Sequence, residues 1–309
     1  SIPAIFIKKR KNIPMVFELR DLWPDIPIVM KILKNPILIY LAKILELWAY
    51  KSSNSIVTLS PEMKKGIVKK KIDPKKIAII PNSSDLERFI FDKKLALKFR
   101  KKRPWLQKRP LLIYTGAFGK VNALNYTIKL AKELLRTKSE IRILQMGDGA
   151  KKKKLVEDAK KNKVYKKNLF IEKPLPKKDM PASLSAASIV SNFVIDIREN
   201  WANSANKFFD GLAAGKPIFL NHGGWMQDLV LINRCGLCMY GKKIETVAKE
   251  LDIALSNNMW LKSKGNSSKK LAKKFFDRNI HAKQIEEVLS LTKNNRSRLV
   301  SKVTSNFYK

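Results

Sequence analysis

Residues 111–119 read LLIYTGAFG, an apolar run of five residues that ends in a turn with two glycines. A short apolar run closed by turn residues is typical of a buried strand in a parallel sheet. Asn122 is expected to cap the helix that follows. The apolar positions of that helix recur at helical spacing and are Leu124, Ile128, Ala131 and Leu135. A strand, a turn and a crossover helix in this order predict a unit of the α/β class.

Short apolar runs alternate with helical stretches on both sides of this unit, which predicts further parallel strands and crossover helices. The expected strands are residues 2–7, 15–19, 55–59, 77–80, 141–146, 168–171, 188–194 and 217–221. The expected helices are residues 28–50, 61–71, a lysine-rich stretch from 151, 181–187, 204–214 and most of 240–291. The helix at 28–50 is expected to be interrupted near Asn35 and Pro36.

A charged segment, residues 92–110, separates two such α/β regions, and its Pro104 and Pro110 interrupt regular structure. The chain has 309 residues, of which 45% are hydrophobic, so it can form packed cores. At ~100–200 residues per domain, this length favours two domains. We therefore expect one domain at residues 1–107 and a second at residues 108–309.

The formal net charge of the chain is +38, from 64 Lys and Arg against 26 Asp and Glu. Such a charge suggests nucleic acid or an anionic membrane surface as a partner. The lysines are spread through every segment instead of being gathered with aromatic residues in one module, which argues against nucleic acid. A general lysine bias, an anionic membrane surface and phosphate-rich substrates all remain open as explanations.

The sequence holds no run of eighteen uncharged apolar residues, so we expect no membrane-spanning helix. Cys235 and Cys238 are the only cysteines and cannot staple a chain of this length, which favours a reducing, cytoplasmic compartment. They have no second ligand pair for zinc, and we interpret them as inert core residues. His222 and His281 lack partners at metal-ligand spacing and are expected on the surface or in loops.

Two segments place a helix start after a predicted strand, where unpaired backbone N–H groups can bind phosphate. The first is residues 115–119, whose glycines allow a close approach of the backbone. The second is residues 203–207, where Lys207 adds a positive charge. A plain tight turn explains the first segment equally well, and ordinary capping by Ser204 or Asn206 explains the second.

Residues 203–217, NSANKFFDGLAAGKP, resemble the donor-site helix of the GT-B retaining glycosyltransferases of family four. Other parts of that family's pattern follow in the same order from about residue 13 to residue 240. They are ELRDLWP at 18–24, LSP at 59–61, IPN at 80–82 with Asp85 and Phe89, Tyr114 with Gly116, GDG at 147–149 and GGW at 223–225. The resemblance is to the branch that builds surface polysaccharides from lipid-linked sugars.

The resemblance implies a GT-B fold, in which two Rossmann-like domains face a cleft, with the first domain incomplete because the chain is N-terminally truncated. It implies a hexosyl- or N-acetylhexosaminyl-type transferase that moves a sugar from a nucleotide-diphosphate sugar, expected to be UDP-linked, to a saccharide or lipid-linked saccharide acceptor. The second domain would hold the donor and the first the acceptor. The implied location is cytoplasmic, with peripheral attachment to the inner membrane face also open. The alternative is a basic, non-catalytic protein that binds nucleic acid or anionic membrane.

Carried over to this chain, the family's pattern implies catalytic roles for Lys207 and Asp210 and acceptor-side roles for Arg20 and Asp21. Positive charge at Lys207 would neutralise the departing diphosphate, so neither a metal nor another cofactor is expected. The implied donor-binding residues are Gly116, Phe118, Gly119, Lys120, Asn122, Gly147, Asp148, Gly149, Ser204, Asn206, Lys207 and Asp210.

The chain departs from the family's pattern at several of these positions. Ala202 stands where the family has its first Glu, Ala117 where it has an Arg, and Asp210 where it has its second Glu. A carboxylate of either length accepts two hydroxyl hydrogen bonds, so Asp210 can still hold a ribose. Lys120 could compensate for the lysine that the family has near Asn122.

Two further expectations concern the first domain. The helix at residues 28–50, with Lys31, Lys34 and Lys43, is expected either to pack in the core or to dock on anionic lipid. Because the first βα units of the acceptor domain would precede Ser1, the chain as given is expected to bind donor but to transfer sugar inefficiently. Its uncovered sheet edge is expected to favour aggregation.

Overall fold

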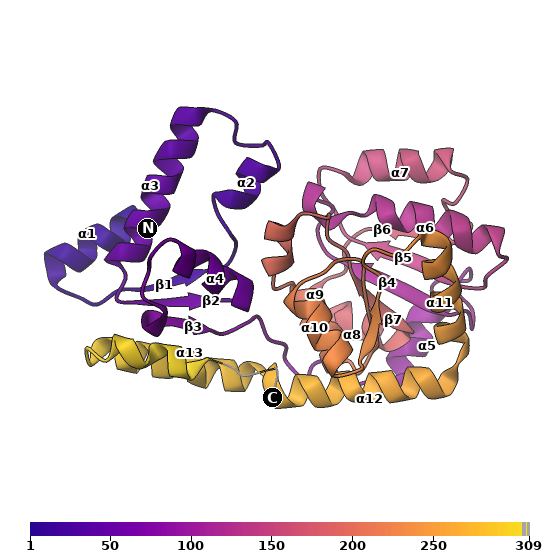
Figure 1. Ribbon diagram of the computed structural model, residues 1–309. Coiled ribbons are helices and arrows are strands. Elements are labelled where there is room, and N and C mark those ends of the chain that lie inside the picture. The colour runs from indigo at the N-terminus through magenta and orange to yellow at the C-terminus, as the bar shows by residue number, and fades with distance from the viewer. Residues whose placement is uncertain (305–306, 308–309) are drawn as a thin grey trace. The chain divides into compact units, whose positions relative to one another are not determined.

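The computed structural model describes residues 1–304 and residue 307, and it divides into two compact units (Figure 1). Unit 1 consists of Ser1–Asn82, Ile197–Ser204 and the described residues from Arg278 onward. Unit 2 consists of Ser83–Asp196 and Ala205–Asp277. Each unit is built on a parallel sheet, as the α/β pattern of the sequence predicts.

Unit 1 contains a three-stranded parallel sheet in the order β1-β2-β3. The strands are β1 (Val16–Leu19), β2 (Ser55–Thr58) and β3 (Ile77–Ile79). The helices are α1 (Ile2–Lys11), α2 (Asp25–Val29), α3 (Pro36–Ser52), α4 (Pro61–Lys69) and α13 (Arg278–Lys293), with 3-10 turns at Pro74–Lys76, Arg198–Ala202 and Ser297–Val303. Successive residues of β2 serve opposite faces, because Ile56 packs with Tyr50 and Met63 whereas Val57 packs with Val288. Helices α3 and α4 therefore cover one face of the sheet, and α13 covers the other.

Two elements of unit 1 differ from those expected. The prediction of a strand at residues 2–7 is wrong, because this apolar run is the first part of α1. Pro3 occupies the first turn of that helix, and four basic residues in its last turn complement the negative end of the helix dipole. The predicted helix at 28–50 is two helices, because the side chain of Asn35 caps a new helix that begins at Pro36.

A buried carboxylate ties three helices of unit 1 together. Glu46 on α3 is almost fully buried, accepts a hydrogen bond of 3.0 Å from the Tyr50 hydroxyl and pairs with the ammonium of Lys70. Asp25, at the start of α2, lies 3.3 Å from the same ammonium. Lys70 directly follows α4, so the end of that helix is held by two carboxylates from other helices.

Unit 2 contains a six-stranded parallel sheet in the order β6-β5-β4-β7-β8-β9 (Figure 1). Its strands are β4 (Leu111–Thr115), β5 (Arg142–Met146), β6 (Leu169–Glu172), β7 (Ile189–Asn192), β8 (Ile218–Leu220) and β9 (Gly236–Cys238). Its helices are α5 (Lys93–Lys101), α6 (Asn125–Arg136), α7 (Lys152–Lys161), α8 (Met180–Ala186), α9 (Asn206–Ala213), α10 (Trp225–Ile232), α11 (Ile244–Ser256) and α12 (Asn258–Phe275), with 3-10 turns at Lys120–Asn122 and Lys177–Asp179. The strand order reverses between β4 and β7, and sheets of this kind bind ligands outside the strands' carboxyl ends at such a point.

The helices of unit 2 form two packing groups. Buried side chains of α6, α7 and α11 share one apolar core with strands β4 and β5. In the second group, α12 packs against α9, and α8 packs against α5. The sheet is therefore covered by helices on both faces, and the carboxyl ends of its strands stay open to a ligand.

The start of α6 differs from the expected one. The prediction that Asn122 caps this helix is wrong, because α6 begins at Asn125 with Leu124 in the cap position. Asn122 ends a 3-10 turn, and its amide nitrogen donates to the carbonyl oxygen of Ala117 at 2.9 Å. Ala123 follows in the left-handed conformation, with φ of 43°, which separates the 3-10 turn from the helix.

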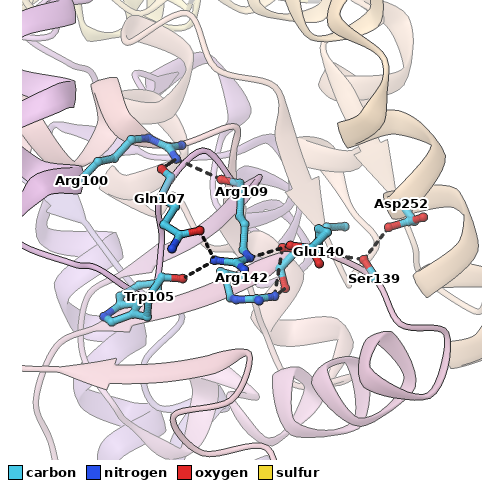
Figure 2. Close-up of polar contacts among 9 residues, drawn as sticks. Arg100, Trp105, Gln107, Arg109, Ser139, Glu140, Arg142 and Asp252 are labelled. Atoms are coloured by element: carbon cyan, nitrogen blue, oxygen red, sulfur yellow. Dashed lines mark hydrogen bonds and ion pairs between the residues drawn. The ribbon is translucent and has the colours of Figure 1, made fainter.

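The charged segment at residues 92–110 belongs to unit 2 and is not a linker. Arg100 on α5 donates to the backbone oxygens of Gln107 at 2.9 Å and Arg109 at 3.0 Å (Figure 2). Arg109 in turn pairs with Glu140, just before β5, at 2.6 Å. These contacts bind the segment to the start of the unit 2 sheet. The expected domain boundary at residue 107 therefore differs from the observed division between the units, which falls ahead of α5.

Candidate functional site

A pocket of about 390 Å³ lies at the carboxyl ends of β4 and β5 in unit 2, and we call it the β4 pocket. It is lined by Thr115, Gly116, Met146, Pro174, Leu175, Met180, Asn206, Lys207 and Asp210. The strand ends, the loop after β6 and the first turns of α8 and α9 all contribute to it. The β4 pocket is therefore at the position where the topology predicts a ligand.

Lys207 supplies positive charge to the β4 pocket from the first turn of α9. Its ammonium lies 5.0 Å from the centroid of the Tyr114 ring. Burial lowers the pKa of Lys207 to about 8, and the nearby carboxylate of Asp210 opposes only part of this effect. No hydrogen bond or ion pair to the ammonium is present within the described part of the chain. A half-buried, unpaired cation that faces a pocket is suited to an anionic ligand.

Asp210 lies one turn beyond Lys207 on the same helix, and its carboxylate is held in place by Ser84. The Ser84 hydroxyl donates to Asp210 Oδ1 at 2.7 Å. Ser84 is itself buried, with 1% of its surface exposed, and its backbone N–H donates to the carbonyl oxygen of Phe276 at 2.9 Å. The carboxylate therefore presents a fixed acceptor to the pocket.

The turns after β4 and β5 pack directly on each other beside the β4 pocket. A Cβ atom at Gly147 would lie 1.9 Å from the carbonyl oxygen of Gly116, so only glycine fits there. Gly116 has φ of 141°, and a Cβ atom on it would lie 3.0 Å from Cε of Lys207. The absence of a side chain at Gly116 therefore leaves the room in which the Lys207 ammonium sits.

The predicted donor residues are distributed over several places. Gly116, Asn206, Lys207 and Asp210 come together in the β4 pocket. Gly119 and Lys120 line a different pocket, described below. The remaining predicted residues of unit 2 do not line the β4 pocket; they are Phe118, Asn122, Gly147, Asp148 and Gly149.

Phe118 and the GDG turn support the site without lining it. The Phe118 side chain is fully buried, and its ring lies 6.3 Å from that of Tyr114. Its backbone N–H donates to the carbonyl oxygen of Asp148 at 2.8 Å. Asp148 is exposed, and hydrogen bonds from the Gly149 N–H and the Lys152 ammonium lower the pKa of its carboxyl. These contacts fix the two turns beside the β4 pocket, and the predicted ligand contacts of these residues stay a prediction.

The other predicted residues lie in unit 1. Ser204 accepts a hydrogen bond of 3.1 Å from the backbone N–H of Asn82 on its hydroxyl oxygen. Arg20 donates to Glu18 at 2.7 Å and to the side-chain oxygen of Asn82 at 2.9 Å. Asp21, next to it, is exposed. Arg20, Asn82 and Ser204 thus form one connected polar group in unit 1.

Both histidines are buried, which corrects the expectation of surface positions. His222 donates from Nδ1 to the carbonyl oxygen of Gly223 at 2.8 Å, and its Nε2 accepts from the Asn192 amide at 3.2 Å. Burial lowers the pKa of His222 to about 4. It is therefore neutral at physiological pH, as a core histidine with both nitrogens satisfied.

Cys235 and Cys238 are free thiols at the start and end of the β9 segment. Burial raises the pKa of both to about 12, so neither carries a thiolate at neutral pH. Within the described residues, no three His, Cys, Asp or Glu side chains gather in a way that could hold a metal. Cys235 is buried, as the predicted core role requires, whereas Cys238 is only half-buried, so the prediction of a core position is wrong for Cys238.

Sequence reasoning missed five residues that shape the site, namely Met146, Pro174, Leu175, Met180 and Ser84. Pro174 and Leu175 lie just after β6, separated from it by Lys173, and their strand-end position is the only signal for them in the sequence. Ser84 lies 126 positions from Asp210, and nothing in the sequence relates the two.

Two parallel α/β units in one chain, one of them with an anion-suited pocket at its topological switch point, are features of the GT-B class of glycosyltransferases. Residues 97–275, more than half of the chain, match the family model of "Glycosyl transferases group 1". Residues 1–88 match the model of "Glycosyltransferase Family 4". The chain belongs to the group 1 glycosyltransferase family.

Solved structures with a similar fold include Alr3699/HepE of Anabaena in complex with UDP and glucose, with 13% identity and a TM-score of 0.77 over 94% of this chain and 74% of that one. A glycosyltransferase of Rickettsia africae has 14% identity and a TM-score of 0.69 over 94% of this chain and 80% of that one. WaaG, a glycosyltransferase involved in lipopolysaccharide biosynthesis, has 16% identity and a TM-score of 0.67 over 89% of this chain and 75% of that one. No curated protein sequence matches the chain. These likenesses establish the GT-B fold.

Proposed function

We propose that this glycosyltransferase moves a hexosyl or N-acetylhexosaminyl group from a UDP-linked sugar to a saccharide or lipid-linked saccharide, with retention at the anomeric carbon, in surface-polysaccharide synthesis. The observation that carries the proposal is the unpaired ammonium of Lys207 beside Gly116 in the β4 pocket. Two complexes of HepE contain UDP and a third contains UDP-glucose, which supports a uridine nucleotide as the donor.

The chemistry follows from the charge that develops when the sugar leaves. As the glycosidic bond to the diphosphate breaks, negative charge grows on the departing oxygen, and a positive group already in position lowers the barrier. Lys207 is the residue that provides this positive charge. Asp210, fixed by Ser84, would accept hydrogen bonds from ribose hydroxyls, which positions the nucleotide.

The experiment is a thermal melt with and without uridine diphosphate. Ligand at about 100 times its dissociation constant should stabilise the protein by about 2.7 kcal/mol. Lys207→Met and Asp210→Asn should each reduce this ligand-induced shift. Lys216→Met is the matched control, because burial also lowers the pKa of Lys216 to about 8 but its ammonium donates to the Ser185 carbonyl, away from the β4 pocket. An unchanged shift in both site variants would contradict the proposed donor site.

The acceptor side of the proposal rests on Arg20 and Asp21. Arg20 has 56% of its side chain exposed and belongs to the polar group with Asn82 and Ser204, so a sugar hydroxyl or phosphate can reach it. Arg20→Ala is expected to raise KM for the acceptor and leave KM for the donor unchanged. An equal change in both KM values would assign Arg20 to folding instead.

Peripheral membrane attachment is the second part of the proposal, and exposed apolar residues on α1 and α3 support it. The two helices are in contact, and their exposed apolar residues are Ile2, Phe6, Ile7, Ile37, Leu38, Tyr40, Leu41, Ile44 and Trp48. The last turn of α1 adds four basic residues, Lys8, Lys9, Arg10 and Lys11. None of the described helices combines the length and apolarity needed to cross a bilayer. An apolar surface edged by basic residues binds anionic lipid without spanning it.

Vesicle flotation tests this attachment. The protein should float with vesicles that contain anionic lipid and not with neutral vesicles, and high salt should release it. Leu41→Glu should abolish flotation, whereas Leu289→Glu, at an equally exposed leucine on α13, should not. Equal flotation with anionic and neutral vesicles would contradict the proposal.

A further inference from the structure

Unit 2 has a second pocket, of about 360 Å³, which we call the α6 pocket. It is lined by Gly119, Lys120, Ala123, Leu124, Asn125, Lys151, Lys154, Leu155 and Ile195. These residues come from the turns after β4, β5 and β7 and from the starts of α6 and α7, so the pocket is at the binding edge of the sheet. It shares no lining residue with the β4 pocket.

The charge of the α6 pocket is positive and uncompensated. Lys120, Lys151 and Lys154 line it, and no carboxylate does. Within the described residues, none of these three ammonium groups makes an ion pair or a hydrogen bond. The carboxylate of Asp148, close in sequence, is directed to Lys152, which does not line the pocket. Three lysines that line one pocket, with no carboxylate in its lining, are suited to a multiply charged anion.

The backbone adds hydrogen-bond donors to the same pocket. The N–H groups of Ala123, Leu124 and Asn125 find no acceptor in the part of the chain that the structure describes. The cap position of α6 makes no side-chain hydrogen bond that would satisfy them. Successive N–H groups around a left-handed residue such as Ala123 form a concavity for anions. The lysines and these donors are separate observations that point to the same ligand chemistry.

We propose that the α6 pocket binds a phosphoryl group, as a phosphate or a diphosphate, at a site separate from that of the donor nucleotide. Phosphoryl oxygens accept the hydrogen bonds of backbone N–H groups, and their charge of about −2 matches the lysines. A diphosphate carried by the acceptor and the headgroup of an anionic lipid both present this chemistry. The site therefore extends the proposed function without depending on it.

The test uses inorganic pyrophosphate in a calorimetric titration on a Lys207→Met background, so that the β4 pocket does not contribute. Lys151→Met with Lys154→Met should weaken pyrophosphate binding at least about tenfold, a change of about 1.4 kcal/mol. Lys153→Met is the matched control, because Lys153 lies exposed on the same helix outside the pocket, and it should bind like the background. Both variants should keep the far-ultraviolet circular dichroism of the parent.

A second arm identifies the source of the phosphoryl group. Vesicles that contain phosphatidic acid are used as a competitor for pyrophosphate, and glycerol 3-phosphate is used as the soluble counterpart. Competition by either probe on the Lys207→Met background, together with loss of direct binding of that probe in the double variant, supports the site and names its source. Pyrophosphate binding that the double variant retains, or that the Lys207→Met background lacks, overturns the proposal. If the double variant in an otherwise native chain loses uridine diphosphate binding together with pyrophosphate binding, the α6 pocket is part of the donor site and the inference fails, while the proposed function stands.

Discussion

The binding of uridine diphosphate is expected to depend on pH in the range where Lys207 titrates. Burial lowers the pKa of Lys207 to about 8 in the free protein. A diphosphate placed against the ammonium favours the charged form and therefore raises this pKa in the complex. Binding then takes up a proton. The affinity for uridine diphosphate is therefore highest below the pKa of the free protein and falls as the pH rises above about 8.

The magnitude follows from the fraction of Lys207 that is protonated. With a pKa of about 8, the protonated fraction falls by about tenfold between pH 7 and pH 9. The dissociation constant should rise by the same factor, which is about 1.4 kcal/mol. The terminal phosphate of the nucleotide has its second pKa at about 6, so it contributes little to the change in the dissociation constant between pH 7 and pH 9.

Isothermal titration calorimetry in buffers of different ionisation enthalpy measures both quantities. At pH 9 the native protein should take up close to one proton per nucleotide. Lys207→Arg should bind with a flat pH profile, since the guanidinium stays charged, and Lys207→Met should bind weakly with a flat profile. The same pH slope in the native protein and in Lys207→Met would refute the reasoning, because another group would then be titrating.

Three further predictions concern single positions. Gly116→Ala should destabilise the chain by about 1–3 kcal/mol and weaken nucleotide binding, because the added Cβ is both strained and against the pocket lysine; Gly241→Ala, also at positive φ but with open space around it, should leave nucleotide binding unchanged in the same melts. Ser84→Ala should reduce the preference for uridine diphosphate over its 2′-deoxy analogue, with rescue by Ser84→Thr, because Asp210 loses its fixed orientation; an undiminished preference would show that the hydroxyl does not position the carboxylate. Lys70→Met should lower the free energy of unfolding, measured by urea denaturation, by about 3 kcal/mol, because it leaves the buried carboxylate of Glu46 without its cation. Replacement of both Lys70 and Glu46 by apolar residues should recover most of the loss.

The sheet of unit 2 could be predicted from the sequence because each strand is a short apolar run bounded by turn residues. The strand at Leu111–Thr115 has the expected ends, and the expected strands at 141–146 and 217–221 are correct within one residue at each end. The run at residues 2–7 has the same composition but continues into basic residues that favour a helix end, and composition alone does not separate these cases. The charged segment at 92–110 resembles a linker in sequence, and only the structure reveals that its arginines bind backbone oxygens.

Part of the candidate site was predictable, Gly116 and Lys207 from their positions at a strand end and a helix start, and Asp210 from the family resemblance. Lys207 and Asp210 are three positions apart on one helix, so they share a face, and Gly116 ends a strand at the switch point. Phe118 could not be placed, because whether a turn residue faces ligand or core depends on how neighbouring turns pack. Ser84 could not be found either, since its contact with the carboxylate spans 126 positions.

Net charge does not identify the site in this chain, because lysines occur throughout it. The site is identified by whether each lysine has a hydrogen-bond or ion-pair partner. Lys207 and Lys216 are alike in burial, which lowers the pKa of each to about 8. The ammonium of Lys216 donates to a carbonyl oxygen at 2.9 Å, whereas that of Lys207 has no such partner in the described chain and faces the β4 pocket. An unpaired, desolvated charge destabilises the folded state, and a bound anion removes that cost. The same criterion separates the unpaired lysines that line the α6 pocket from Lys152, which lies next to Lys151 in the sequence and is paired with Asp148.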